Sequence, residues 1–255
     1  MKYVTLSLCA GALIALATTR EVPAHACGAA YPGGPMVCTM NDAPGHHAAL
    51  ASAPPIARVF ASYSFTSTTI LFGDPRRADL VRSAAFVGAE VPVGERGMTV
   101  RFGAGGVLDG HLALGNGGRV RLGPGPTGFF GLGLPIVANR GAIPFVQISG
   151  TLAATRVATL GPGPNEGPSF TAFDLRAAAT AGYQFDWFVP YVAARVFGGP
   201  IFYRYAGEAV TGTDLNKYQV AGGFAASFFH RTFDLFVEGV PLGERGVSAG
   251  LGTTF

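Results

Sequence analysis

Residues 246–255 read GVSAGLGTTF, and their alternation narrows the choice of fold. Successive side chains of a β-strand point to opposite faces. One face of this segment is mostly apolar and consists of Val247, Ala249, Leu251, Thr253 and Phe255, and the other holds only Ser, Gly and Thr. An apolar strand face meets either the core of a soluble sandwich or membrane hydrocarbon, so the rest of the chain must distinguish the two.

The composition excludes several classes of protein. Charged residues are 13% of the 255 residues, against about 25% in ordinary soluble domains. The 38 glycines and 18 prolines would interrupt long helices, and the high apolar content argues against disorder. Lys and Arg are scattered and the net charge is only +3, so we expect no nucleic-acid partner.

The N-terminal segment has the pattern of a secretory signal peptide. Lys2 precedes an apolar run over residues 6–17, and Ala24-His25-Ala26 fits the small-x-small cleavage rule. We therefore expect residues 1–26 to be removed on export, although residues 15–17 offer a second cleavage position.

Residues 27–55 are rich in Pro and polar residues, so we expect a short irregular periplasmic segment that acts as a linker or a partial plug. Cys27 and Cys38 are its two cysteines, and an oxidising compartment favours a disulfide between them. Lipidation of Cys27 is the alternative. His46 and His47 lack companions at zinc-ligand spacing, so we expect no metal and no cofactor.

Residues 56–255 predict an all-β, antiparallel transmembrane β-barrel, because they divide into about ten alternating segments separated by turns. Eight or twelve strands are the alternatives. The expected strands are 57–66, 83–92, 98–109, 127–137, 143–155, 170–185, 188–203, 217–228, 231–240 and 246–255. The stretches expected as long external loops are 66–82, 110–126, 156–168 and 204–216.

Aromatic residues gather at the ends of these segments, as interfacial girdles require. With this alternation, the chain resembles the small outer-membrane β-barrel superfamily of Gram-negative bacteria. The resemblance implies a place in the bacterial outer membrane, in contact with lipid and lipopolysaccharide, and we take a monomer as the default. It also implies recognition by the barrel-assembly machinery through a terminal signal that falls on Val247, Ala249, Leu251 and Phe255.

The interior decides the function of such a barrel. The residues expected to line the lumen are Arg58, Glu90, Arg101, Asp109, His111, Asp174, Arg176, Arg195, Asp234 and Glu238. Many other inward positions are Gly or Ala, which leaves space in the lumen. We therefore expect a narrow passive pore, or a barrel that holds a small solute or an apolar ligand. The mixed charges also fit an internal ion-pair network, so a closed structural or adhesive barrel is the alternative.

A rim hydrolase, either a protease or a lipid deacylase, is a further alternative. Asp109 and His111 lie two residues apart at the outer end of an expected strand, as a base and its orienting carboxylate require. No other motif supports catalysis. The arginines at 76, 77, 119 and 121 are expected near lipopolysaccharide phosphates or in water.

Overall fold

The computed structural model describes residues 57–255, apart from the tips 74–75, 94–97, 116–117, 138–142, 161–165, 186, 206–207 and 230–231. It also describes the backbone of two short strands, β1 (His25–Ala29) and β2 (Met36–Met40). Within these residues, no helix combines the length and the hydropathy that a membrane-spanning helix needs.

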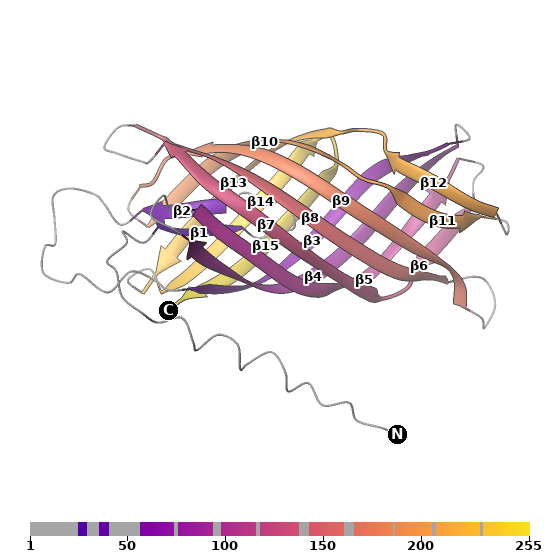
Figure 1. Ribbon diagram of the computed structural model, residues 1–255, viewed down its shortest axis with the longest axis horizontal. Helices are drawn as coiled ribbons and strands as arrows, with labels where there is room; N and C mark the ends of the chain where they lie inside the picture. The colour runs from indigo at the N-terminus through magenta and orange to yellow at the C-terminus, as the bar shows by residue number, and fades with distance from the viewer. Residues whose placement is uncertain are drawn as a thin grey trace, which may run out of the picture.

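The other described strands form one antiparallel sheet that closes on itself, because β15 pairs with β3 and β8 pairs with β9 (Figure 1). Its strands are β3 (Arg58–Phe72), β4 (Arg77–Val93), β5 (Met98–Leu114), β6 (Arg119–Leu122), β7 (Gly125–Val137), β8 (Phe145–Leu160), β9 (Glu166–Gly182), β10 (Phe188–Gly198), β11 (Ile201–Tyr205), β12 (Glu208–Asp214), β13 (Tyr218–Phe228), β14 (Phe233–Leu242) and β15 (Arg245–Thr254).

Three strands of the barrel are each broken into two segments. Gly123 and Pro124 separate β6 from β7, and Gly199 and Pro200 separate β10 from β11. The third pair is β12 and β13. Proline lacks the N–H that the ladder needs, which explains two of the breaks. With each broken pair counted once, the thirteen segments form a ring of ten strands. The expected all-β fold of about ten strands is confirmed.

The barrel narrows toward the end opposite the C terminus. β14 and β15 have 10 residues each, whereas β4, β5 and β9 have 17. Beyond the tip of the short β14–β15 hairpin, β12 crosses over and pairs directly with β3 through Gly212–Asp214. The ring therefore has ten strands below the hairpin tip and eight above it. We call these parts the membrane section and the outer section.

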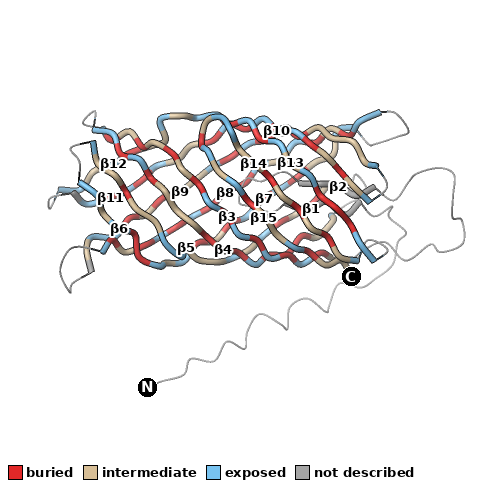
Figure 2. The backbone as a smooth tube through the Cα atoms, turned by 180° about the vertical axis from the view of Figure 1, so that it is seen from behind, coloured by how far each residue is buried: buried red, intermediate tan, exposed pale blue. Residues whose placement is uncertain are grey.

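The two sections have opposite polarity. Figure 2 shows buried and exposed residues alternating along the strands. In the membrane section the exposed positions of β3 are Val59, Ala61, Tyr63 and Phe65, and the buried ones include Arg58, Ser62, Ser64 and Thr66. In the outer section the same strand buries Ile70 and Phe72, and its partner β4 exposes Arg77 and Asp79.

The expected long external loops are therefore largely wrong. β3 and β4 extend through most of residues 66–82 and leave only residues 73–76 between them. The other expected loops likewise contain strand ends or whole strands. These stretches alternate as strands do, but their apolar side chains face inward, so they carry no lipid-facing pattern.

Strand length supports this division. A tilted strand crosses the hydrocarbon core in about 9–11 residues, which matches β14 and β15. The extra residues of the other strands belong to the outer section, whose outward face is polar. A closed antiparallel barrel with an apolar outer band is the architecture of the bacterial outer membrane, in agreement with the expected location.

The two N-terminal strands lie at the end of the barrel that holds the C terminus (Figure 1). They approach β3, β4 and β10. Cys27 and Cys38 are direct partners in the register of this hairpin, so the disulfide remains a prediction that the backbone accommodates. Residues 1–24, which hold most of the expected signal peptide, and His46-His47 lie outside the described residues.

Candidate functional site in the barrel interior

Most of the charged residues expected in the lumen lie inside the membrane section. Arg58, Glu90, Arg101, Arg176, Arg195, Asp234 and Glu238 are buried, and Asp174 is half-buried beside Arg176. These side chains come from β3, β4, β5, β9, β10 and β14, so they line the ring from several sides.

The centre of the membrane section holds a connected polar network. Arg195 donates to Glu238 at 2.9 Å and to the amide oxygen of Gln219 at 2.7 Å. The Tyr191 hydroxyl donates to the same glutamate at 3.3 Å. Arg195 and Glu238 are among the most deeply buried side chains, so each charge depends on the other for its compensation.

The tip of the β14–β15 hairpin extends this network. Glu244 is buried, accepts a hydrogen bond from Gln219 at 3.1 Å and pairs with Arg176 at 2.6 Å. Gly243 precedes it with φ of 86°, a backbone conformation that side chains disfavour. An added Cβ at Gly243 would also collide with the backbone of Tyr218. This turn therefore aims Glu244 into the lumen.

A separate polar cluster lies nearer the C-terminal end. Arg58 pairs with Asp234 at 2.9 Å, and Ser227 donates to the other oxygen of that carboxylate at 2.7 Å. The remaining opposite charges, Glu90 and Arg101, are direct partners in the β4–β5 register. Both clusters join neighbouring or distant strands by charge-assisted hydrogen bonds.

The polar residues of this interior that the sequence analysis missed include Arg82, Asp214, Gln219 and Glu244. Arg82 and Asp214 fall in stretches that were expected to be loops. Glu244 falls in the short turn of residues 241–245. Arg82 and Glu90 are an even number of residues apart on β4, so their side chains share one strand face. This spacing could have indicated that Arg82 faces inward.

Five of the small inward residues do not leave free space in the barrel interior. Each of five inward glycines lies directly across from an aromatic residue of the next strand, and the ring covers the glycine. The pairs are Gly88 with Phe60, Gly103 with Phe129, Gly182 with Phe145, Gly223 with Tyr191 and Gly250 with Phe236. A Cβ added at any of them would come closer than 3.0 Å to the ring.

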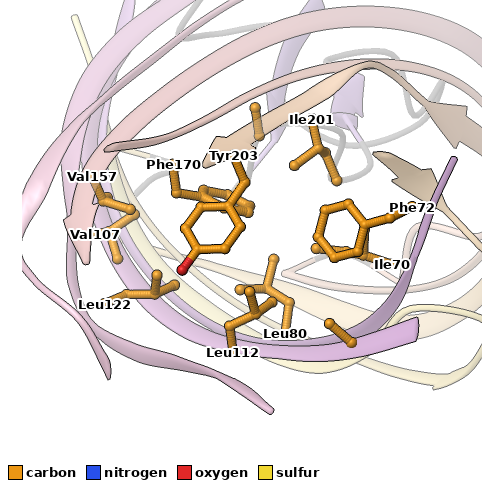
Figure 3. Packing of buried hydrophobic residues seen from close by; sticks show 12 residues of the cluster. Ile70, Phe72, Leu80, Val107, Leu112, Leu122, Val157, Phe170, Ile201 and Tyr203 are labelled. Carbon is orange, nitrogen blue, oxygen red and sulfur yellow. The ribbon is translucent and has the colours of Figure 1, made fainter. Parts of the chain in front are cut away.

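The outer section is filled by apolar side chains (Figure 3). Its cluster consists of Ile70, Phe72, Ala78, Leu80, Val107, Leu112, Leu122, Val157, Phe170, Ala172, Ile201 and Tyr203. Between this cluster and the polar network lies a cavity of about 40 Å³, next to Arg82, Arg176 and Glu244. One water molecule needs roughly 10–15 Å³ of such volume, so this cavity suits a few waters.

Asp109 and His111 do not lie in the lumen. Ser83 pairs with Asp109 and Ala84 pairs with Val107, so Leu108 is an extra residue in β5. Such a bulge shifts the alternation by one residue and turns the later odd positions outward. The prediction of a lumen position for these two residues is therefore wrong.

The same two residues take arginine partners on the outer wall. Asp109 lies 3.7 Å from Arg121, and both are about 70% exposed. The His111 ring contacts the Arg119 guanidinium at 2.9 Å. Desolvation and the positive charge of Arg119 lower the pKa of His111. Asp109 and His111 thus contact arginines and make no hydrogen bond with each other, so their geometry does not support the rim-hydrolase hypothesis, and the described residues hold no metal-binding cluster.

The last strand faces lipid as expected. Val247, Leu251 and Phe255 are exposed on the outer wall of the membrane section, and Ala249 is half-buried between them. Phe255 is held in place by a hydrogen bond from its N–H to the carbonyl oxygen of Ala57, at 3.0 Å. The role of these four residues in assembly remains a prediction.

No protein-family model matches the chain, and no curated protein matches its sequence. The translocator domain of autotransporter NalP from Neisseria meningitidis is similar in fold, with a TM-score of 0.49 and 15% identity over 81% of this chain and 91% of that one. The transport unit of the autotransporter AIDA-I from Escherichia coli has a TM-score of 0.45 and 9% identity, over 81% of this chain and 92% of that one. These likenesses concern the shape of a barrel and carry no information on activity.

Proposed function

We propose that this protein is a closed structural barrel of the bacterial outer membrane, which does not conduct solutes. The observation that supports the proposal is the apolar cluster of the outer section, whose side chains come from seven of the eight strands of this part of the barrel and meet in its interior. A solute that entered from outside would have to displace Phe170 and Tyr203, whose rings pack 6.3 Å apart.

The membrane section supports the same proposal. Its interior is occupied by the ion pairs around Arg195 and Arg176 and by the glycine-backed aromatic rings. A buried charge that loses its partner is strongly destabilising, so these ion pairs favour a closed arrangement of the interior. The expected passive pore is therefore the less well supported function.

The outer wall of a closed barrel is the surface that remains for contact with other molecules. The turns that the structure describes at its outer end are short, so an adhesive role through long loops has little support. The outer wall instead exposes Arg119, Arg121 and Arg156. Contact of these arginines with phosphates of lipopolysaccharide fits their charge.

Conductance of the refolded full chain in planar bilayers tests the proposal. We expect no steady current steps, and no uptake of small sugars by liposomes that contain the protein. A heat-modifiable band on gels and co-flotation with the liposomes must first show that the barrel has folded and inserted. Steady current steps from such inserted protein would overturn the proposal.

A further inference from the structure

The outer mouth of the barrel contains an apolar pocket of about 320 Å³. Phe72, Leu114, Tyr203 and Val210 line it, from β3, β5, β11 and β12. Phe72 and Tyr203 are buried members of the apolar cluster (Figure 3), and the other two pack against that cluster. The pocket thus lies at the outer end of the apolar cluster.

The pocket carries positive charge at its edge. Arg76 and Arg77 are exposed and are the charged residues among its lining. An apolar floor with cationic groups at its edge matches a ligand with an apolar tail and an anionic head.

We propose that this pocket binds a single-chain amphiphile with an anionic head, such as a fatty acid. The chain would lie on Phe72, Leu114 and Val210, and the carboxylate would accept hydrogen bonds from Arg76 or Arg77. A volume near 300 Å³ is at the small end of ligand pockets, so a medium-length chain fits better than a long one. The filled barrel below makes the pocket a terminal binding site and not an entrance to a channel.

Calorimetric titration of decanoate into the full chain in nanodiscs tests this proposal, with empty nanodiscs as the reference for partitioning into lipid. We expect saturable binding beyond that reference. Decanol, which has the same chain without the charge, should bind about tenfold more weakly, since a hydrogen bond to a charged group contributes about 1.5 kcal/mol or more. Equal binding of the alcohol and the acid would overturn the anionic specificity.

Three variants localise the site. Val210→Phe fills the pocket and should abolish saturable binding. The double variant Arg76→Gln, Arg77→Gln should weaken decanoate binding about tenfold. Its matched control, Arg119→Gln, Arg121→Gln, removes the same charge from the outer wall and should bind like the wild type.

Two results would overturn the proposal. One is undiminished binding by folded Val210→Phe, and the other is an equal loss in the two double variants, which would reveal only a general effect of surface charge. The heat-modifiable band identifies any variant that has not folded. The conductance experiment is independent of these titrations, because a closed barrel can lack a ligand and a conducting one can bind decanoate.

Discussion

The membrane section and the outer section are built from the same strands, yet their interiors differ: the outer section is filled by apolar side chains, whereas the membrane section combines buried ion pairs with aromatic rings. On β9, the inward residues of the outer section are Phe170 and Ala172, whereas those of the membrane section include Arg176 and Thr180. The outward residues change in the other direction, from Ser169 to Leu175. The strand keeps its alternation throughout, and only the chemistry of its two faces is exchanged.

The medium around the barrel wall therefore decides which face of a strand carries apolar residues. Where lipid surrounds the wall, outward apolar residues cost nothing, and the polar residues inside must satisfy one another. Where water surrounds the wall, burial of apolar side chains is the main stabilising contribution, as in a soluble domain.

Arg195→Ala should lower the free energy of unfolding by about 4 kcal/mol, because it leaves the buried Glu238 charge uncompensated. Urea unfolding in phospholipid vesicles, followed by fluorescence of the single tryptophan Trp187, gives the measurement. Arg121→Ala, which removes an exposed ion pair of the outer wall, should cost less than about 0.5 kcal/mol. An equal loss of stability in the two variants would contradict a buried ion-pair network in the membrane section.

Phe170→Ala should cost about 3–4 kcal/mol, because it opens a cavity in the apolar filling of the outer section. Its control is Phe173→Ala on the same strand, since Phe173 is 42% exposed and faces outward, against 1% for Phe170. We expect about 1 kcal/mol for the control, because lipid fills the space that it leaves. The same urea titration measures both, and a smaller loss for Phe170→Ala would show that the outer section lacks a packed core.

Leu175→Arg should cost about 3 kcal/mol, because it places a charge on the lipid-facing wall. Ser169→Arg, on the same face of β9 but in the outer section, should change the stability by less than about 0.5 kcal/mol. Comparable penalties at both positions would mean that hydrocarbon also covers the outer section. The pair thus locates the membrane boundary along one strand.

Gly250→Ala should cost about 2 kcal/mol, because the new methyl group would strike the Phe236 ring that covers this glycine. Gly239→Ala on β14 is the control, since nothing lies within 4 Å of its added Cβ. A neutral Gly250→Ala would indicate that the lumen has spare room, as the small residues first suggested. Urea midpoints of the two variants in one lipid give the comparison.

The sequence predicted the barrel and most of its lumen residues because both follow from strict alternation. It placed Arg195, Glu238 and Asp234 on the inward face, where the structure has them. It failed at Asp109 and His111 because one extra residue, Leu108, shifts the alternation, and a bulge leaves no mark in hydropathy. It also took the inward glycines for empty space, since the rings that cover them come from neighbouring strands.

An antiparallel barrel with an apolar band could be predicted from the sequence alone, because the alternation of side chains is local and every strand in lipid must show it. Only the tertiary structure decided where that band ends, which strands continue beyond it and what fills the interior. Those properties depend on pairings between distant segments, such as β12 with β3 across the short β14–β15 hairpin. A single strand carries no information on which neighbour will cover its glycines or compensate its charges.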